Sequence, residues 1–120
     1  MYQPTVNYHE ACQNPEEQKA FEAGAMEEAQ KLLAIRLGAD GFETVEDARR
    51  YLRGHNNLEL MIRAGRLAEI ASEEYDRAID PNADPDKSFK CLADCYLCQQ
   101  MADIIHDVVG ATSEHLALAC

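Results

Sequence analysis

The pattern of apolar and polar positions predicts helices through most of the chain. Apolar side chains recur three and four residues apart over 15–37 and 58–79, with charged residues opposite them. Over 86–109 they form two stripes, and a short helix is predicted over 45–53. No stretch alternates as a half-buried strand would. The sequence therefore predicts an all-α fold, a small antiparallel bundle of three long helices and one short helix.

Helix starts are marked by capping residues. Asn14-Pro15 and Asp84-Pro85 each combine a capping side chain with a proline that suits the first helical position. Thr44 with Asp47 predicts a capping box.

Glycines mark the expected helix ends. The segment 38–41 holds two glycines, and Gly110 is expected to end the 86–109 helix, with a short C-terminal helix after it. Residues 1–14 show no sustained period and are expected to form an N-terminal arm. Residues 15–120 are expected to form a single helical-bundle domain.

The 86–109 helix is expected to be buried on two sides, because it is apolar on both. We expect Phe89, Leu92 and Tyr96 to pack against 58–79. The second stripe is expected to pack on the first helix or on a second copy of the chain; it consists of Cys91, Cys95, Cys98, Ala102, Ile105 and Val109. Three long helices give limited cover for two apolar faces, which favours a homodimer.

Three thiols and an imidazole on this helix have the residue types of a soft-metal site. Cys91, Cys95 and Cys98 share one face, and His106 follows two turns later; thiolates favour Cu(I) and Zn(II). The segment 91–98 locally resembles the cysteine-rich helices of bacterial copper-storage bundles, which implies copper binding. Those bundles line several helices with cysteine, whereas the other long helices here have none. Packing as small hydrophobes and redox switching are the alternatives.

Composition limits the classes of partner. A net charge of −11 argues against direct binding of nucleic acid or of an anionic membrane, since both need cationic contacts. No apolar run is long enough for a membrane span, and no secretion signal is evident. Five cysteines, three of them crowded on one helix, do not fit a disulfide framework. A cytoplasmic protein with reduced thiols is expected.

Acidic residues recur along two of the predicted helices and suggest a contact surface. Spaced carboxylates on a rigid helix can imitate a phosphate backbone and bind a basic groove, although a solvated face is the simpler interpretation. The exposed apolar residues Leu58, Ile62 and Ile70 are expected to anchor such a contact. The candidate acids are Glu16, Glu17, Glu27, Glu28, Glu69, Glu73, Glu74 and Asp76.

The arginines are concentrated in the middle of the chain and form a candidate anion site. Guanidinium groups suit phosphate or carboxylate, whereas ion pairs with Glu46, Glu59 and Glu69 would neutralise them. The candidates flank the turn at Gly54: Arg49, Arg50, Arg53, Arg63 and Arg66.

No catalytic motif is present, so neither an enzyme nor a cofactor is expected. The sequence favours a non-enzymatic acidic helical protein that recognises a macromolecular partner with a basic surface, for example a nucleic-acid-binding protein, by charge mimicry. The hypothesis includes inhibition of that partner. A thiolate Cu/Zn or redox-responsive protein and a small enzyme are the alternatives.

Overall fold

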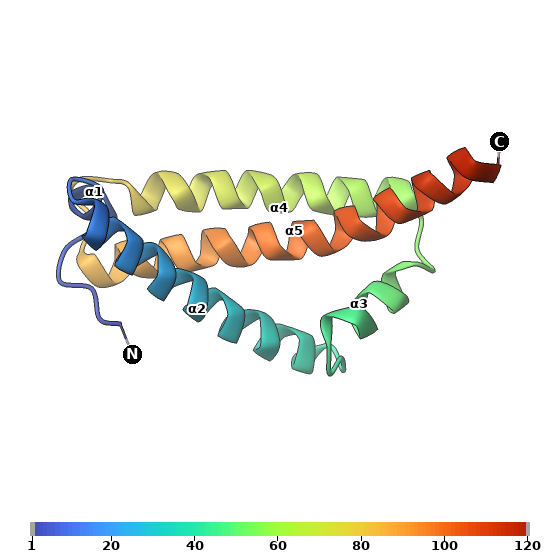
Figure 1. Cartoon of the computed structure of the whole chain (residues 1–120), viewed down its shortest axis with the longest axis horizontal. Helices are drawn as coiled ribbons and strands as arrows, with labels where there is room; N and C mark the ends of the chain where they lie inside the picture. The colour runs from blue at the N-terminus through green and yellow to red at the C-terminus, as the bar shows by residue number, and fades with distance from the viewer. Residues whose placement is uncertain (1, 120) are drawn as a thin grey trace.

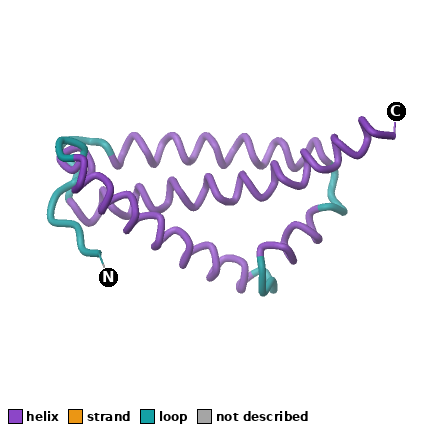
Figure 2. Tube along the Cα trace, in the orientation of Figure 1, coloured by secondary structure: helices purple, strands orange, loops and turns teal. Residues whose placement is uncertain are grey.

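The computed structural model describes residues 2–119, with side chains placed for residues 2–110. Its elements are α1 (Tyr8–Ala11), α2 (Pro15–Ala39), α3 (Val45–Leu52), α4 (Asn57–Ala78) and α5 (Pro85–Ala119). The described part of the chain contains no strand (Figure 2). The predicted all-α bundle is confirmed. No helix within 2–119 is both long and apolar enough to cross a bilayer.

Helix α5 is the centre of the bundle. It packs along α4 for most of that helix's length and against α2, whereas α2 and α4 barely touch each other. Figure 1 shows that α2 starts close to α5 and then diverges from it, and that α3 leads the chain back toward α4. The molecule is elongated, with extents of 52 × 27 × 21 Å.

The predicted helix starts are confirmed, because short-range capping bonds determine them. Asn14 accepts a hydrogen bond from the Glu16 amide at 3.0 Å, and Asp84 accepts one from the Lys87 amide at 3.3 Å. Thr44 and Asp47 exchange side-chain-to-amide bonds of 3.1 Å, which complete the capping box.

Two predicted helix ends need correction. Helix α2 continues past Gly38 to Ala39, and Gly41, at φ +86°, is the residue that adopts the left-handed conformation. The Phe42 amide then closes the end by donating to the Leu37 carbonyl at 2.8 Å. The prediction for Gly110 is wrong: α5 runs through it to Ala119, since one glycine costs a helix only about 1 kcal/mol.

Phe89 and Cys95 of α5 have other neighbours than those predicted for their faces. Phe89 packs against Phe21 of α2, with ring centroids 5.7 Å apart. Cys95 instead faces Ala68 and Ala71 of α4. Periodicity defines the faces of a helix but not their neighbours. Here small thiols meet a stripe of alanines, which allows α4 and α5 to approach closely.

Residues 2–14 contribute to the core at the end of the molecule where α1 lies. Tyr8 is buried against Phe21, with ring centroids 5.3 Å apart. The fully buried Ser88 hydroxyl accepts from the Tyr8 amide at 2.8 Å and donates to the Ala78 carbonyl at 2.6 Å. Asn7 donates to the carbonyls of the α4–α5 loop. We call this region the aromatic end.

A second, aliphatic core lies toward the other end of the molecule. Leu60 and Ala64 of α4 pack there against Ile105 and Val108 of α5, and α3 adds Leu52 at the edge. No residue of α2 belongs to this cluster. The divergence of α2 therefore leaves its last turns away from the aliphatic core.

Candidate functional site

The three thiols of α5 lie along its contact with α4. Cys91 and Cys95 are buried, with exposed fractions of 7% and 1%, and Cys98 is partly buried. The second apolar side of α5 is therefore covered within the monomer.

The surroundings of these thiols keep them protonated. Burial raises the pKa of Cys95 to about 11, with smaller contributions from Cys98 and Glu74. Burial and a hydrogen bond to the Glu74 carboxylate raise the pKa of Cys91. Burial also raises the pKa of Cys98, with Asp94 adding to the effect and Arg36 opposing it. A protonated thiol is a poor nucleophile and a poor metal ligand.

The geometry does not assemble the thiols with His106. That imidazole is exposed on α5, two turns beyond the nearest cysteine. Among residues 2–110, no three histidine, cysteine or acidic side chains are grouped closely enough to hold a metal ion. No observation on these residues favours the metal-binding or redox alternative.

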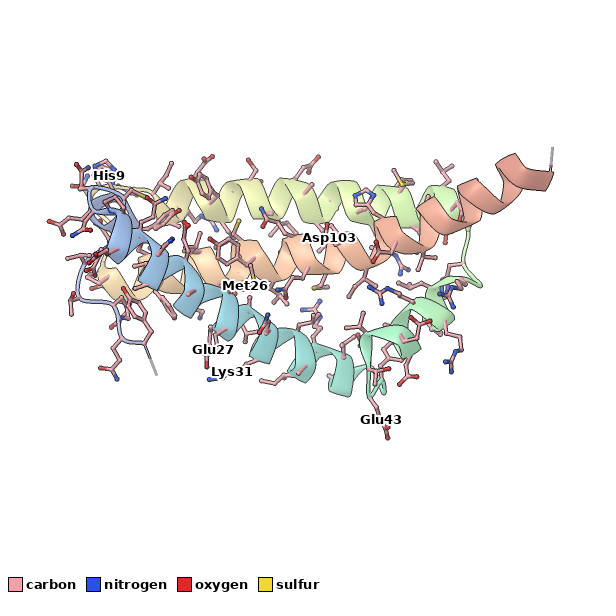
Figure 3. All side chains as sticks on the ribbon, in the orientation of Figure 1. His9, Met26, Glu27, Lys31, Glu43 and Asp103 are labelled. Carbon is pink, nitrogen blue, oxygen red and sulfur yellow. The ribbon has the colours of Figure 1, made fainter. Side chains whose placement is uncertain are left out.

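The predicted acidic residues occupy two separate helix faces. Glu16, Glu17, Glu27 and Glu28 lie on α2, and Figure 3 shows Glu27 and Lys31 on the side of α2 away from α5. The other set lies on α4. The two sets therefore belong to helices that both pack on α5 and have little contact with each other.

Within α4, the acids follow a row of exposed apolar side chains. Leu58 and Ile62 are 70% and 65% exposed. Helical spacing places Glu69, Glu73 and Asp76 on the same outward side, about two to four turns beyond Ile62. Ile70, the third expected anchor, is only partly exposed. We call this side the outer face of α4.

Ion pairing differs among the acids of α4. Glu74 is mostly buried and bonds Arg77 at 2.6 Å. Glu69 has one contact of 3.9 Å with Arg66, and both side chains are well exposed. Glu73 and Asp76 make no ion pair with any described residue. The outer face thus has two carboxylates without a cation beside them.

Several of the predicted arginines are neutralised by acids. Arg49 bonds Asp107 of α5 at 2.9 Å and Glu46 at 3.6 Å. Arg53 also pairs with Glu46, and Arg50 approaches Asp47. The pairing with Glu46 was predicted, whereas the Asp107 bond joins residues 58 positions apart and has no local signal.

The remaining arginines lie beside a groove of about 820 Å³. Arg63 and Arg66 of α4 line it from one side, and Arg36 of α2, which the sequence did not single out, lines it from the other. Helices α2, α3, α4 and α5 all contribute to its lining. The apolar lining residues include Leu33, Leu37, Leu52, Met101, Ile104 and Ile105. We call this feature the arginine-edged groove.

The charges along the groove contrast with those of the whole chain. Arg36 and Arg63 make no ion pair with a described residue, and Asp40 is the one acid among the lining residues. The protein carries a net charge of −11, so this edge is a local cationic site on an acidic molecule.

No protein-family model, curated protein or solved structure matches this chain. Sequence reasoning found Arg63 and Arg66 but not Arg36. The available signal was Leu33, Arg36 and Leu37 at helical spacing near the end of α2. These three residues line the groove because α2 diverges from α5, and the local sequence pattern does not predict that divergence.

Proposed function

We propose that this chain is a non-enzymatic binding protein that recognises a partner protein with a basic surface through the outer face of α4. One observation supports the proposal most. That face combines exposed apolar residues, led by Leu58, with the carboxylates Glu69, Glu73 and Asp76, and no described residue covers it. Exposed apolar groups beside charges are typical of protein interaction sites.

Charge complementarity supports a basic partner. The unpaired Glu73 and Asp76 lose no internal ion pair on binding a cation, and the weak Glu69–Arg66 contact is easily exchanged. The field of a molecule with charge −11 would also accelerate encounter with a basic surface.

The spacing of the acids suits a partner that binds nucleic acid. Along the axis of α4, Glu69 and Glu73 are separated by about 6 Å, and Glu73 and Asp76 by about 4.5 Å. The phosphates of one DNA strand follow each other at about 3.4 Å along the axis, so these acids form a sparser row of negative charges on a rigid rod. Inhibition of such a partner by occupation of its groove belongs to the proposal.

The compartment and the oligomeric state also belong to the proposal. A cytoplasmic setting is consistent with the unpaired state of all four cysteines between 2 and 110. A homodimer through the outer face of α4 is the competing use of Leu58. The oligomeric state therefore has to be measured beside partner binding.

A matched pair of charge variants tests the proposal. Glu69→Gln/Glu73→Gln/Asp76→Asn removes three charges from the outer face of α4. Glu16→Gln/Glu17→Gln/Glu28→Gln removes three from α2, so the net charge of the two variants is equal. Each protein is immobilised and used to capture proteins from the organism that encodes it. The captured partner is then purified and its affinity measured at 50 and 200 mM salt.

We expect a basic partner that binds the α4 variant at least about tenfold more weakly than wild type and the α2 variant within about threefold. Its affinity for wild type should fall at least about tenfold between the two salt concentrations, and a DNA duplex should compete with it. Equal affinities for the two variants, or an affinity indifferent to salt, would contradict the proposal. So would a monomer that captures nothing.

A further inference from the structure

We propose that the arginine-edged groove is a binding site for a small amphiphile with one acyl chain and a carboxylate head. This site is separate from the partner contact on α4, and it stands whether or not that contact exists. The proposal depends on three observations: the size of the groove, its apolar floor and the charges at its edge.

The size of the groove and the helices that line it fit a small molecule. Its volume of about 820 Å³ lies within the range of ligand sites in proteins, which is about 300–1,000 Å³. Its walls come from α2, α3, α4 and α5 together. A docked helix usually lies along an open channel between neighbouring helices, whereas here helices bound the space on several sides.

The floor of the groove is apolar and provides a surface for an acyl chain. Ala48, Ile104 and Ile105 are buried beneath it, and Leu52 and Met101 are partly exposed to it. Each methylene group of a chain that loses contact with water here strengthens binding by about fourfold.

The edge of the groove selects an anionic head group. Arg36 from α2 and Arg63 from α4 have no ion pair among the described residues, and Arg66 has only its 3.9 Å contact with Glu69. Guanidinium groups bind carboxylates through paired, charge-assisted hydrogen bonds. The net charge of −11 disfavours anions overall, so a preference for a carboxylate requires a local cationic site such as this edge.

Titration calorimetry with three ligands below their micellar concentrations tests the proposal. We use dodecanoate, dodecyltrimethylammonium and acetate. Non-specific binding to a protein of charge −11 favours the cationic surfactant. The groove should reverse this order, with dodecanoate bound at least about tenfold more tightly than the ammonium. Acetate, which lacks the chain, should give no measurable heat. A preference for the ammonium overturns the proposal.

Two matched arginine variants locate the head group. Arg36→Gln/Arg63→Gln should weaken dodecanoate binding by about ten- to a hundredfold. Arg50→Gln/Arg53→Gln removes the same charge from α3 outside the groove lining and should change binding by less than about threefold. All four side chains are exposed, so both variants should fold, which thermal unfolding checks. Equal losses in the two variants overturn the assignment.

Chain length and self-association test the acyl site. Decanoate should bind about fifteenfold more weakly than dodecanoate, since it lacks two methylene groups. An affinity independent of chain length overturns the proposal.

Sedimentation of the protein alone tests a second copy of the chain as the occupant of the groove. A dimer that Arg36→Gln/Arg63→Gln dissociates would assign the groove to that copy and would also overturn the proposal.

Discussion

The two ends of this molecule are built from the same helices but packed in different ways. At the aromatic end, α1, α2, α4 and α5 converge, and Tyr2, Tyr8, Phe21 and Phe89 contact one another. At the other end α2 has diverged from α5 (Figure 1), and residues of α2, α3, α4 and α5 line the arginine-edged groove. Rigid packing at one end thus accompanies an accessible apolar surface at the other.

The difference shows how a short chain can combine stability with a binding surface. Buried aromatic rings and the Ser88 hydrogen bonds hold four segments together at one end. At the other end α4 and α5 are held together by the aliphatic core, and α3 is tied to α5 by the Arg49–Asp107 ion pair. Substitutions at four positions test this difference between the two ends.

The largest expected effect is the removal of an aromatic ring from the closed end. Phe21 is fully buried and contacts three other rings, so Phe21→Ala should lower the free energy of unfolding by about 3–5 kcal/mol. Leu37→Ala in the groove wall should cost less than about 1.5 kcal/mol, because that side chain is only partly buried. Urea denaturation measures both. Similar losses would show that the two ends are packed alike.

The next effect concerns the buried hydroxyl that joins α1 to α4 and α5. Ser88→Ala should cost about 2 kcal/mol, because it leaves the Tyr8 amide and the Ala78 carbonyl buried with fewer partners. Ser72→Ala on the exposed side of α4 is the control and should change stability by less than about 0.5 kcal/mol. Equal losses of stability in the two variants would show that the Ser88 hydrogen bonds do not stabilise the aromatic end.

A third effect tests the thiols on the α4–α5 contact that connects the two ends. Burial raises the pKa of Cys95 from its ordinary 9.0 to about 11. A group whose pKa is higher in the folded state stabilises the fold fully below pH 9 and loses that contribution as pH rises toward 11. Wild type should therefore lose about 2 kcal/mol more stability than Cys95→Ala between pH 8.5 and 11.

The matched control for this pH series is Cys12→Ala, which removes an exposed thiol. Its stability should follow the wild-type curve, because this side chain lies at the surface and not on the α4–α5 contact. If Cys95→Ala also follows that curve, the Cys95 thiol is not the group whose ionisation opposes folding.

The smallest effect examines the close approach of the N-terminal segment to α2. A Cβ atom at Gly24 would lie 2.7–2.9 Å from three side-chain atoms of Tyr2. Gly24→Ala should therefore fail to stabilise wild type, although alanine is favoured in a helix by about 1 kcal/mol. In a Tyr2→Ala background the same substitution should stabilise by about that amount. Equal effects in the two backgrounds would show that Tyr2 does not lie on Gly24.

Local signals made part of this structure predictable. The caps at Asn14, Thr44 and Asp84 involve residues two or three positions apart, so the sequence shows them directly. The two apolar sides of α5 were likewise visible in its periodicity. Which helix covers each side was not, because that choice depends on matching small and large side chains between distant segments.

The candidate sites divide in the same way. The acidic stretches and the arginine-rich stretch are evident in the sequence. The predicted arginines flank the turn at Gly54 as expected. The groove itself depends on Arg36 of α2 and Arg63 of α4 lining one space beside the divergent end of α2. The role of residues 2–14 was also hidden, because Asn7 and Tyr8 act through bonds to residues more than 70 positions away.

Amide hydrogen exchange tests the central contrast most directly. The account predicts that amides of α3 and of the last turns of α2 exchange at least about a hundredfold faster than those of 88–96 in α5, because local opening at the groove end breaks few buried contacts. Dodecanoate should slow exchange at the groove end alone. Uniform protection along α2, α3 and α5 would contradict the account.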